Sequence, residues 1–246
     1  MKVLVIGEFC YDVFIYGTTK RLSPEAPVPV FVPVRRTENA GMAGNVVKNI
    51  KSITVGAEVN LIRQDCVITK TRYVEDKSNH MFMRIDEGEE RIKPMSMDNK
   101  NFSGYDIVIV SDYNKGFLSD PQLLQIGNAC TGISVLDSKR KLTQKIVDSF
   151  NFIKVNEHEY HNNANILSMN SAKVIITLGK EGVSYMDEII PSPSPKETID
   201  VSGAGDTFTA SFAVRYFETK DIKLSIRFAN EMSAIVVSKR GVVTPN

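Results

Sequence analysis

The second half of the chain alternates short apolar runs with longer mixed segments. Four runs rich in β-branched residues each end at polar residues or at a glycine: Tyr105–Val110 at Ser111, Ile133–Leu136 at Asp137, Phe152–Val155 at Asn156, and Lys173–Thr177 before Gly179. Such runs predict parallel strands that helices cover on both faces. Ligands of such sheets bind at the carboxyl ends of the strands, so we expect these polar residues to converge on one edge.

The first part of the chain predicts strands of two kinds. Lys2–Gly7 is a short apolar run that stops at a glycine, which indicates a buried strand. Val13–Tyr16 is rich in β-forming residues, and Val28–Val34 alternates valine with Pro29, Phe31 and Pro33. Because proline cannot donate to a strand ladder, this second segment predicts an edge strand or a flap.

Two further segments complete the pattern. Met81, Met83 and Ile85 alternate with polar or aromatic neighbours over residues 81–86, which predicts an antiparallel strand with two different faces. Asn39–Asn45 contains two glycines and predicts a turn that leads into a helix over Val46–Ile50.

Composition narrows the class of protein. The chain has 246 residues, 42% of them hydrophobic and 24% charged, with a net charge of +1. These values are typical of a globular protein and give no reason to expect a nucleic-acid or membrane partner. Its three cysteines form no C-x-x-C pair, and no run is long enough for a signal peptide or a transmembrane helix. We therefore expect a reduced, cytoplasmic protein.

The strongest candidate for chemistry is the segment Asp200–Ser211. Gly203, Ala204 and Gly205 precede Asp206, and an apolar-rich segment follows to Phe217, which predicts a tight turn that opens a helix. The first N–H groups of a helix can hold an anion, and small residues let a phosphate approach them. Asp206 then has two interpretations: it caps the helix, or it accepts a proton from a hydroxyl that attacks phosphorus.

Other common sites fit less well. Gly179-Lys180 is followed by Glu181 and lacks the earlier glycine of a P-loop. His158 and His161 are one residue too close for the H-E-x-x-H metalloprotease motif, so we expect them on the surface of a helix.

The Asp200–Asp206 segment resembles the D-T-x-G-A-G-D signature of the ribokinase-like (PfkB) sugar kinases. Gly7–Asp12 and Arg21–Val30 resemble the N-terminus of the heptose-7-phosphate kinase branch, and Ser111–Gly116 resembles its S-D-Y-x-K-G segment. The resemblance implies an α/β fold, a three-layer α/β/α sandwich with a small β-flap. It implies one kinase domain over residues 1–246, with the flap formed by about 12–36 and 67–93.

The resemblance also implies roles for single residues. It makes Asp206 the catalytic base and gives Gly203, Ala204 and Gly205 the anion hole. It implies ATP and Mg²⁺, with the metal held near Asn156 and Glu159, through water. From the residues alone, Glu157 and Glu159 are equally an acidic helix start. The nucleotide-binding residues would be Asn156, Glu159, Thr177, Gly179, Gly182, Asn230 and Lys139. The substrate-binding residues would be Asp12, Gly41, Asn45, Arg72, Arg84 and Lys115.

These roles describe transfer of a phosphoryl group from ATP to a sugar or sugar-phosphate hydroxyl, with heptose 7-phosphate at its anomeric position as the expected acceptor. A kinase for another sugar, or an inactive binding protein that kept the fold, are the alternatives. Three departures from the pattern favour the inactive protein: Glu8 in place of aspartate, Met42 in place of glycine, and a shortened segment over 51–66. The apolar alternation of the flap also offers a surface for a homodimer.

Overall fold

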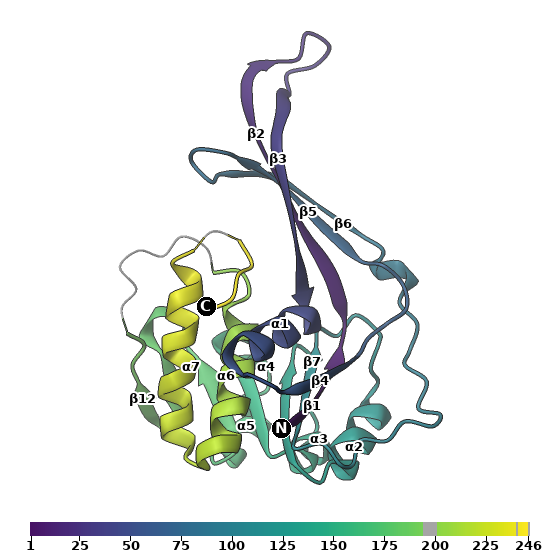
Figure 1. The fold of residues 1–246 in the computed structure, drawn as a ribbon, viewed down its shortest axis with the longest axis vertical. Helices are drawn as coiled ribbons and strands as arrows, with labels where there is room; N and C mark the ends of the chain where they lie inside the picture. The colour runs from purple at the N-terminus through teal and green to yellow at the C-terminus, as the bar shows by residue number, and fades with distance from the viewer. Residues whose placement is uncertain (194–200, 240, 246) are drawn as a thin grey trace.

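The structure is a computed structural model that describes residues 1–193, 201–239 and 241–245. Its α/β body carries a long second sheet that projects away from it (Figure 1). The body sheet has eight strands in the order β12-β11-β10-β9-β8-β7-β1-β4. The bounds of these strands are β1 (Lys2–Gly7), β4 (Glu58–Ile62), β7 (Ile107–Asp112), β8 (Ile133–Ser138), β9 (Phe152–Asn156), β10 (Val174–Thr177), β11 (Val183–Tyr185) and β12 (Glu188–Ile190).

The strands from β10 to β4 pair in parallel, and β11 and β12 join antiparallel at one edge. Parallel strands alternate their side chains between two covered faces. Val3 and Val5 of β1 lie in the core on one face, while Leu4 and Ile6 lie in the core on the other. The expected strands at Lys2–Gly7 and in the second half are confirmed. β4 was not predicted, because Glu58–Ile62 lacks a continuous apolar run.

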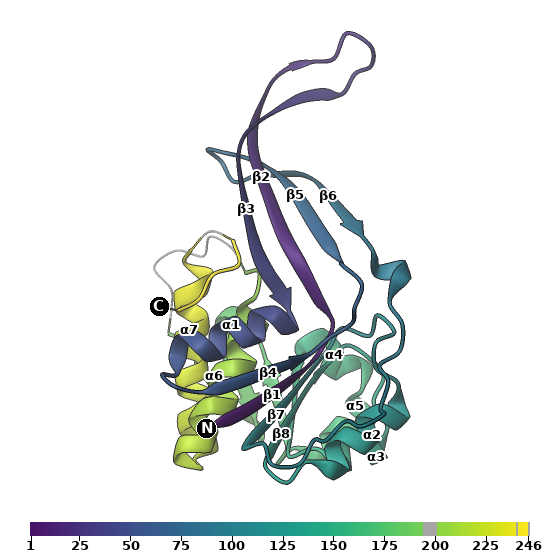
Figure 2. The same ribbon diagram turned by 45° about the vertical axis from the view of Figure 1, so that its right-hand side comes forward.

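Helices cover both faces, as Figure 2 shows. The first face packs against α1 (Ala43–Ile53), α6 (Ala204–Thr219) and α7 (Ile222–Val237). The second face packs against α2 (Asp120–Ala129) and α3 (Gln144–Ser149), with α4 (Glu157–Asn162) and α5 (Ala164–Leu167) on the same side. Three short 3₁₀ helices complete the fold: η1 (Glu89–Arg91), η2 (Ser168–Asn170) and η3 (Gly179–Glu181). The three-layer α/β/α sandwich is confirmed.

The flap is a four-stranded sheet in the order β3-β2-β5-β6. Its strands are β2 (Phe9–Leu22), β3 (Pro29–Met42), β5 (Thr69–Glu75) and β6 (Met81–Glu87). The proline-containing β3 lies at an edge, as predicted. β6 pairs antiparallel with β5, also as predicted, but every residue of β6 is exposed, so neither of its faces packs on the body.

The junction between flap and body differs from the prediction. Residues 39–42 continue β3 instead of forming a turn, and α1 begins at Ala43, three residues earlier than expected. Met42 makes the abrupt change of direction with a φ of 54°, a region that side chains rarely adopt. The glycines of this segment misled the prediction, because they serve close packing here and not a turn.

Across the described ranges, no helix is both long enough and apolar enough to cross a membrane.

Candidate active site

The carboxyl ends of β7, β8 and β9 meet the start of α6 around a cavity of about 160 Å³. The strands contribute Asp112, Asp137 and Asn156, and the helix contributes Gly205 and Asp206. This is the convergence that the strand pattern predicts. The predicted turn and helix after residue 200 are confirmed for the part described, while Asp200 itself lies outside the described residues.

Gly203 makes the turn into α6. Its φ of 80° lies in the left-handed region, and a Cβ there would come within 2.6 Å of Asn45 Nδ2. Only glycine satisfies both conditions without strain. Gly203, Gly205 and Asp206 line the smaller cavity, and the first N–H groups of a helix have no acceptor within the helix.

Asp206 lies in the first turn of α6 but does not cap it. Its carboxylate accepts hydrogen bonds from Asn45 Nδ2 at 2.9 Å on Oδ2 and from the Tyr113 hydroxyl at 3.0 Å on Oδ1. Burial raises the pKa of Asp206 to about 6, and Asp137 adds to the rise, while the bonds from Asn45 and Tyr113 and the charge of Lys154 oppose it. A carboxylate with this pKa can accept a proton near neutral pH.

A second cavity of about 380 Å³ opens on the other side of Asp206, beneath the flap. Of the predicted acceptor residues, Asp12, Arg72, Arg84 and Lys115 line it. All four are already in ion pairs: Arg72 pairs with Asp12 at 2.5 Å, and Lys115 pairs with Glu89 at 2.7 Å. Arg84 pairs with Asp86, its neighbour on β6, at 2.6 Å.

Gly41 and Asn45, for which the resemblance implies contact with the substrate, are not among the residues that line this cavity. A Cβ at Gly41 would lie 2.0 Å from Asp12 Oδ2, so the glycine makes room for that carboxylate. Asn45 is fully buried and holds Asp206 from behind. Gly41 therefore affects the cavity through Asp12, and Asn45 affects it through Asp206.

Asn156 and Glu159 line the smaller cavity, yet they also cap α4. Glu159 N donates to Asn156 Oδ1 and Asn156 N donates to Glu159 Oε2, each at 2.8 Å, which is a capping box. Glu159 is buried and Glu157 exposed, so the two glutamates differ as expected. Glu159 can cap the helix and also hold a metal ion near the phosphates, because the capping box uses only Oε2 and leaves its second carboxylate oxygen for that role.

The remaining predicted nucleotide residues lie away from both cavities, except Lys139, which lines both. Thr177 ends β10, and its hydroxyl donates to Val155 O at 3.3 Å. Gly179 and Gly182 flank η3. Asn230 is buried in α7, where its amide donates to Ile190 O at 3.1 Å and so ties this helix to the end of β12. His158 and His161 are exposed on α4, as predicted.

Lys139 stands between the two cavities. Its Nζ lies 4.0 Å from the ring centre of Tyr113. Burial lowers the pKa of this lysine, while Glu159, Asp137 and Asp206 oppose the shift. Within the described residues it has no ion pair, whereas Arg72, Arg84 and Lys115 each have one.

For several residues of the site the sequence predicted no individual role. Tyr113 and Lys70 line the larger cavity, and Asp137 and Lys154, paired at 3.0 Å, line the smaller one. The terminal polar residues of the strands were the available clue, and they pointed to Asp137. Lys154 faces the site from within β9, where an apolar run hides it.

Glu8, one of the three departures from the family pattern, has a structural role. Its fully buried carboxylate accepts hydrogen bonds from Tyr113 N and Lys115 N, both at 2.9 Å. It therefore fixes the backbone that follows β7 and lies outside the cavity lining.

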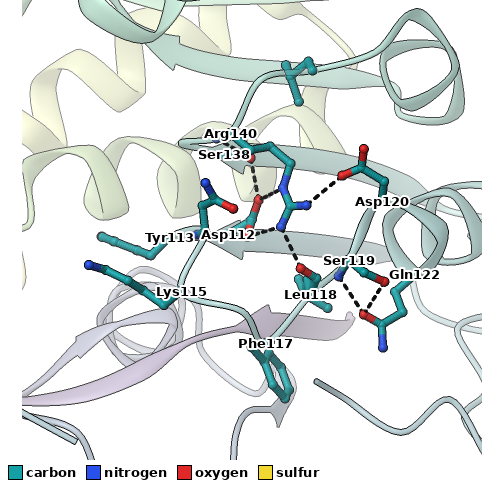
Figure 3. A network of polar contacts seen from close by, with 12 residues as sticks. Asp112, Tyr113, Lys115, Phe117, Leu118, Ser119, Asp120, Gln122, Ser138 and Arg140 are labelled. Carbon is teal, nitrogen blue, oxygen red and sulfur yellow. Dashed lines mark hydrogen bonds and ion pairs between the residues drawn. The ribbon is translucent and has the colours of Figure 1, made fainter. Parts of the chain in front are cut away.

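A buried network completes the wall behind this loop (Figure 3). Arg140 Nε donates to Asp112 Oδ2 at 2.6 Å, and its Nη1 donates to Asp120 at 2.8 Å. Arg140 Nη2 also donates to Leu118 O at 2.8 Å, so one guanidinium joins β7, β8 and the start of α2. Ser138 donates a further bond to Asp112.

Residues 128–246, which carry α6 and the strands of the smaller cavity, match the sequence model of the "pfkB family carbohydrate kinase". Over these residues the chain is similar to the PfkB carbohydrate kinases. Carbohydrate kinases of this family are phosphotransferases with a hydroxyl acceptor. The recognition made from the Asp200–Asp206 motif is confirmed.

The chain also has relatives that match over almost its full length. It is 29% identical to "Bifunctional protein HldE" of Helicobacter pylori (strain Shi470) over 294 residues, which cover 98% of this chain and 63% of that protein. The chain thus spans 63% of this curated relative. Because the alignment is longer than the chain, the relative has segments with no counterpart here.

Solved structures show the ribokinase-like fold. The nucleoside kinase of Methanocaldococcus jannaschii, an archaeal member of the ribokinase family, matches with a TM-score of 0.69 at 18% identity, over 98% of this chain and 93% of that one. Ribokinase of Arabidopsis thaliana, complexed with ribose and ATP, matches with a TM-score of 0.68 at 17% identity, over 98% and 93% of the two chains.

Proposed function

We propose that this chain transfers the γ-phosphoryl group of ATP to a sugar hydroxyl, with Asp206 as the base. The observation that carries the proposal is the position of Asp206. It lies buried at the positive end of α6, between a small cavity lined by strand ends and a larger cavity under the flap. A hydroxyl in the larger cavity and a phosphate in the smaller one would meet at this carboxylate.

In the proposed step the acceptor oxygen forms a bond to the γ-phosphorus while the bond to the β,γ-bridging oxygen breaks. The acceptor proton passes to Asp206, and ADP leaves. The N–H groups of Gly203–Asp206 would hold the negative charge of the transferring group. Lys139 supports this reading, because it faces both cavities without an ion pair among the described residues. Positioning and electrostatics supply most of the acceleration in such transfers.

The residues present suit a Mg²⁺ ion held mainly by water and phosphate. No cluster of three or more histidine, cysteine or acidic residues could hold a metal within the described ranges. Mg²⁺ keeps several waters and needs few protein carboxylates, so the remaining oxygens of Asn156 and Glu159 would hold its waters. The ion would offset phosphate charge.

For the acceptor we propose a sugar that already carries a phosphate, with heptose 7-phosphate, phosphorylated at the anomeric hydroxyl, as the expected compound. Lys70, Arg72, Arg84 and Lys115 surround the larger cavity, and arginine binds phosphate through two parallel hydrogen bonds. The similarity to HldE proteins supports the same branch of the family. The existing ion pairs would have to rearrange around the phosphate.

An ADP-release assay with phosphorylated and unphosphorylated forms of each sugar tests this function. We expect a higher kcat/KM for the phosphosugar, and a smaller preference in Arg72→Ala or Arg84→Ala. Equal kcat/KM values for both forms would indicate that the acceptor is an ordinary hexose or pentose without a phosphate. Nucleotide and sugar binding without ADP release would favour the inactive binding protein.

We also propose that two chains pair through the flap. Val32 and Val34 on β3 are 53% and 64% exposed, and Met81 and Met83 on β6 are 50% and 52% exposed, so both edge strands of the flap present large apolar side chains to solvent. Sedimentation of the wild type as a dimer and of Met83→Lys as a monomer would support it; a wild-type monomer at micromolar concentration would contradict it.

The free cysteines Cys10, Cys66 and Cys130 support the expected cytoplasmic location.

A further inference from the structure

Tyr113 occupies the space between the two charged groups closest to the proposed reaction. It follows β7 directly and lines both cavities. Its hydroxyl donates to Asp206 Oδ1 at 3.0 Å, and its ring lies 4.0 Å beneath Lys139 Nζ. One side chain therefore contacts both the proposed base and the lysine that has no ion pair among the described residues.

The backbone that carries Tyr113 is fixed from two sides. Tyr113 N donates to the buried carboxylate of Glu8 at 2.9 Å. The preceding residue, Asp112, is held by Arg140, and Asn114 N donates to Asp112 Oδ1 at 3.1 Å (Figure 3). Buried polar networks whose members are all bonded hold one arrangement. The ring is thus positioned before any ligand binds.

We propose that Tyr113 is a positioning residue, whose hydroxyl orients the Asp206 carboxylate toward the acceptor and whose ring holds the Lys139 ammonium toward the phosphate. The inference rests on the proposed kinase function. It concerns a residue of the Ser111–Gly116 segment for which the sequence predicted no individual role.

The two contacts have different physical consequences. With Asn45 on Oδ2 and Tyr113 on Oδ1, the carboxylate of Asp206 is held at both oxygens. Hydrogen bonds to a carboxylate favour its charged form, which is the form that accepts a proton. The ring face attracts the lysine cation through its quadrupole.

Other charges also face Asp206 and would act in any titration. Asp137 on β8 raises its pKa, and Lys154 on β9 lowers it. Lys139, after β8, and the Cys10 thiol on β2 also face this group. Because a phenylalanine at position 113 keeps the ring that contacts Lys139, the effect of the hydroxyl alone can be isolated.

Two substitutions separate the roles of hydroxyl and ring. Tyr113→Phe keeps the ring and removes the donor, so the acid limb of kcat/KM should move up by roughly one pH unit, with KM for ATP unchanged. Tyr113→Leu removes both, so KM for ATP should also rise roughly threefold to tenfold. The control is Tyr185→Phe, which removes the 3.0 Å bond of another buried tyrosine to Ala172 O, away from the site.

The titration of Asp206 can also be followed without turnover, by carbon NMR of aspartate labelled at its carboxyl and assigned with Asp206→Asn. An upward shift in Tyr113→Phe but not in Tyr185→Phe supports the inference, even if the wild type transfers no phosphate and the proposed function fails. The same Asp206 titration in both variants overturns the inference, even in an active kinase. A KM for ATP that Tyr113→Leu leaves unchanged overturns the role of the ring.

Discussion

The two sides of Asp206 are built in contrasting ways. On the body side, residues from β7, β8, β9 and α6 meet in a buried network, in which Asp112 and Arg140 are almost entirely removed from water. On the flap side, two ion pairs at the larger cavity, Arg72–Asp12 and Arg84–Asp86, lie within the projecting sheet, and Arg84 keeps 44% of its side chain exposed. The body side is fixed by the fold, whereas the flap side can rearrange.

This difference separates what each side can contribute. A site that must stabilise the same transferring group in every turnover benefits from fixed dipoles and charges. A site that selects the acceptor can use exposed ion pairs, since these contribute little to folding and can exchange partners. We infer that changes on the body side affect stability and rate together, and that changes on the flap side affect acceptor choice.

The largest expected effect is on rate. Asp206→Asn should lower kcat by roughly 10²–10⁴ and leave ATP and sugar binding near normal, because the amide cannot take the acceptor proton. Steady-state ADP release and equilibrium binding measure the two quantities. An Asn variant with turnover near that of the wild type would remove Asp206 from the mechanism.

The next effect contrasts the stability of the two sides. Arg140→Ala leaves the buried Asp112 carboxylate without its cation and should cost about 3–5 kcal/mol of unfolding free energy. Arg84→Ala breaks the partly exposed pair with Asp86 and should cost about 0–1 kcal/mol. Urea denaturation measures both. Equal losses would show that the flap is as firmly built as the body.

Asp206 also predicts a dependence of stability on pH. Because its folded pKa is about 6, above the ordinary 3.8, its contribution to stability is present below pH 4 and is lost as pH rises through 6. Asp206→Asn should therefore be more stable than the wild type by about 1–3 kcal/mol at pH 8, with the gain absent near pH 4. If Asp206→Asn is stabilised equally at pH 4 and pH 8, the gain does not come from the titration of Asp206.

The smallest effect tests the metal. Glutamine also completes a capping box, so Glu159→Gln keeps the start of α4 and removes only charge. We expect the Mg²⁺ concentration for half-maximal activity to rise roughly tenfold. Glu157→Gln, on the exposed side of the same helix, should match the wild type. If the two variants behave alike, the choice between these glutamates is wrong.

The sequence predicted the body better than the flap side for a physical reason. Parallel strands buried on both faces need continuous apolar runs, so β1, β7, β8 and β9 and the polar residues that end them were visible. β4 is an edge strand with only partly buried residues and was missed. The junction at Met42 was also missed, because close packing and turn formation both call for glycine.

For the site, motif residues were found and their partners were not. Asp206 stands in a recognisable segment, but the residues that hold it, Asn45 and Tyr113, come from segments distant in the sequence. Asn45 was expected at the substrate and lies behind the base. Only the folded chain shows which of several buried polar residues touch one another.

The most direct test of the central claim is the pH dependence of kcat/KM for the wild type, with the preferred acceptor and saturating ATP. If Asp206 takes the acceptor proton, kcat/KM should fall about tenfold per pH unit below a midpoint near 6, the pKa that burial gives this carboxyl. The residual activity of Asp206→Asn should not show this fall of kcat/KM at low pH. A wild-type profile that is flat from pH 5 to 8, or a limb that persists in Asp206→Asn, would contradict the account.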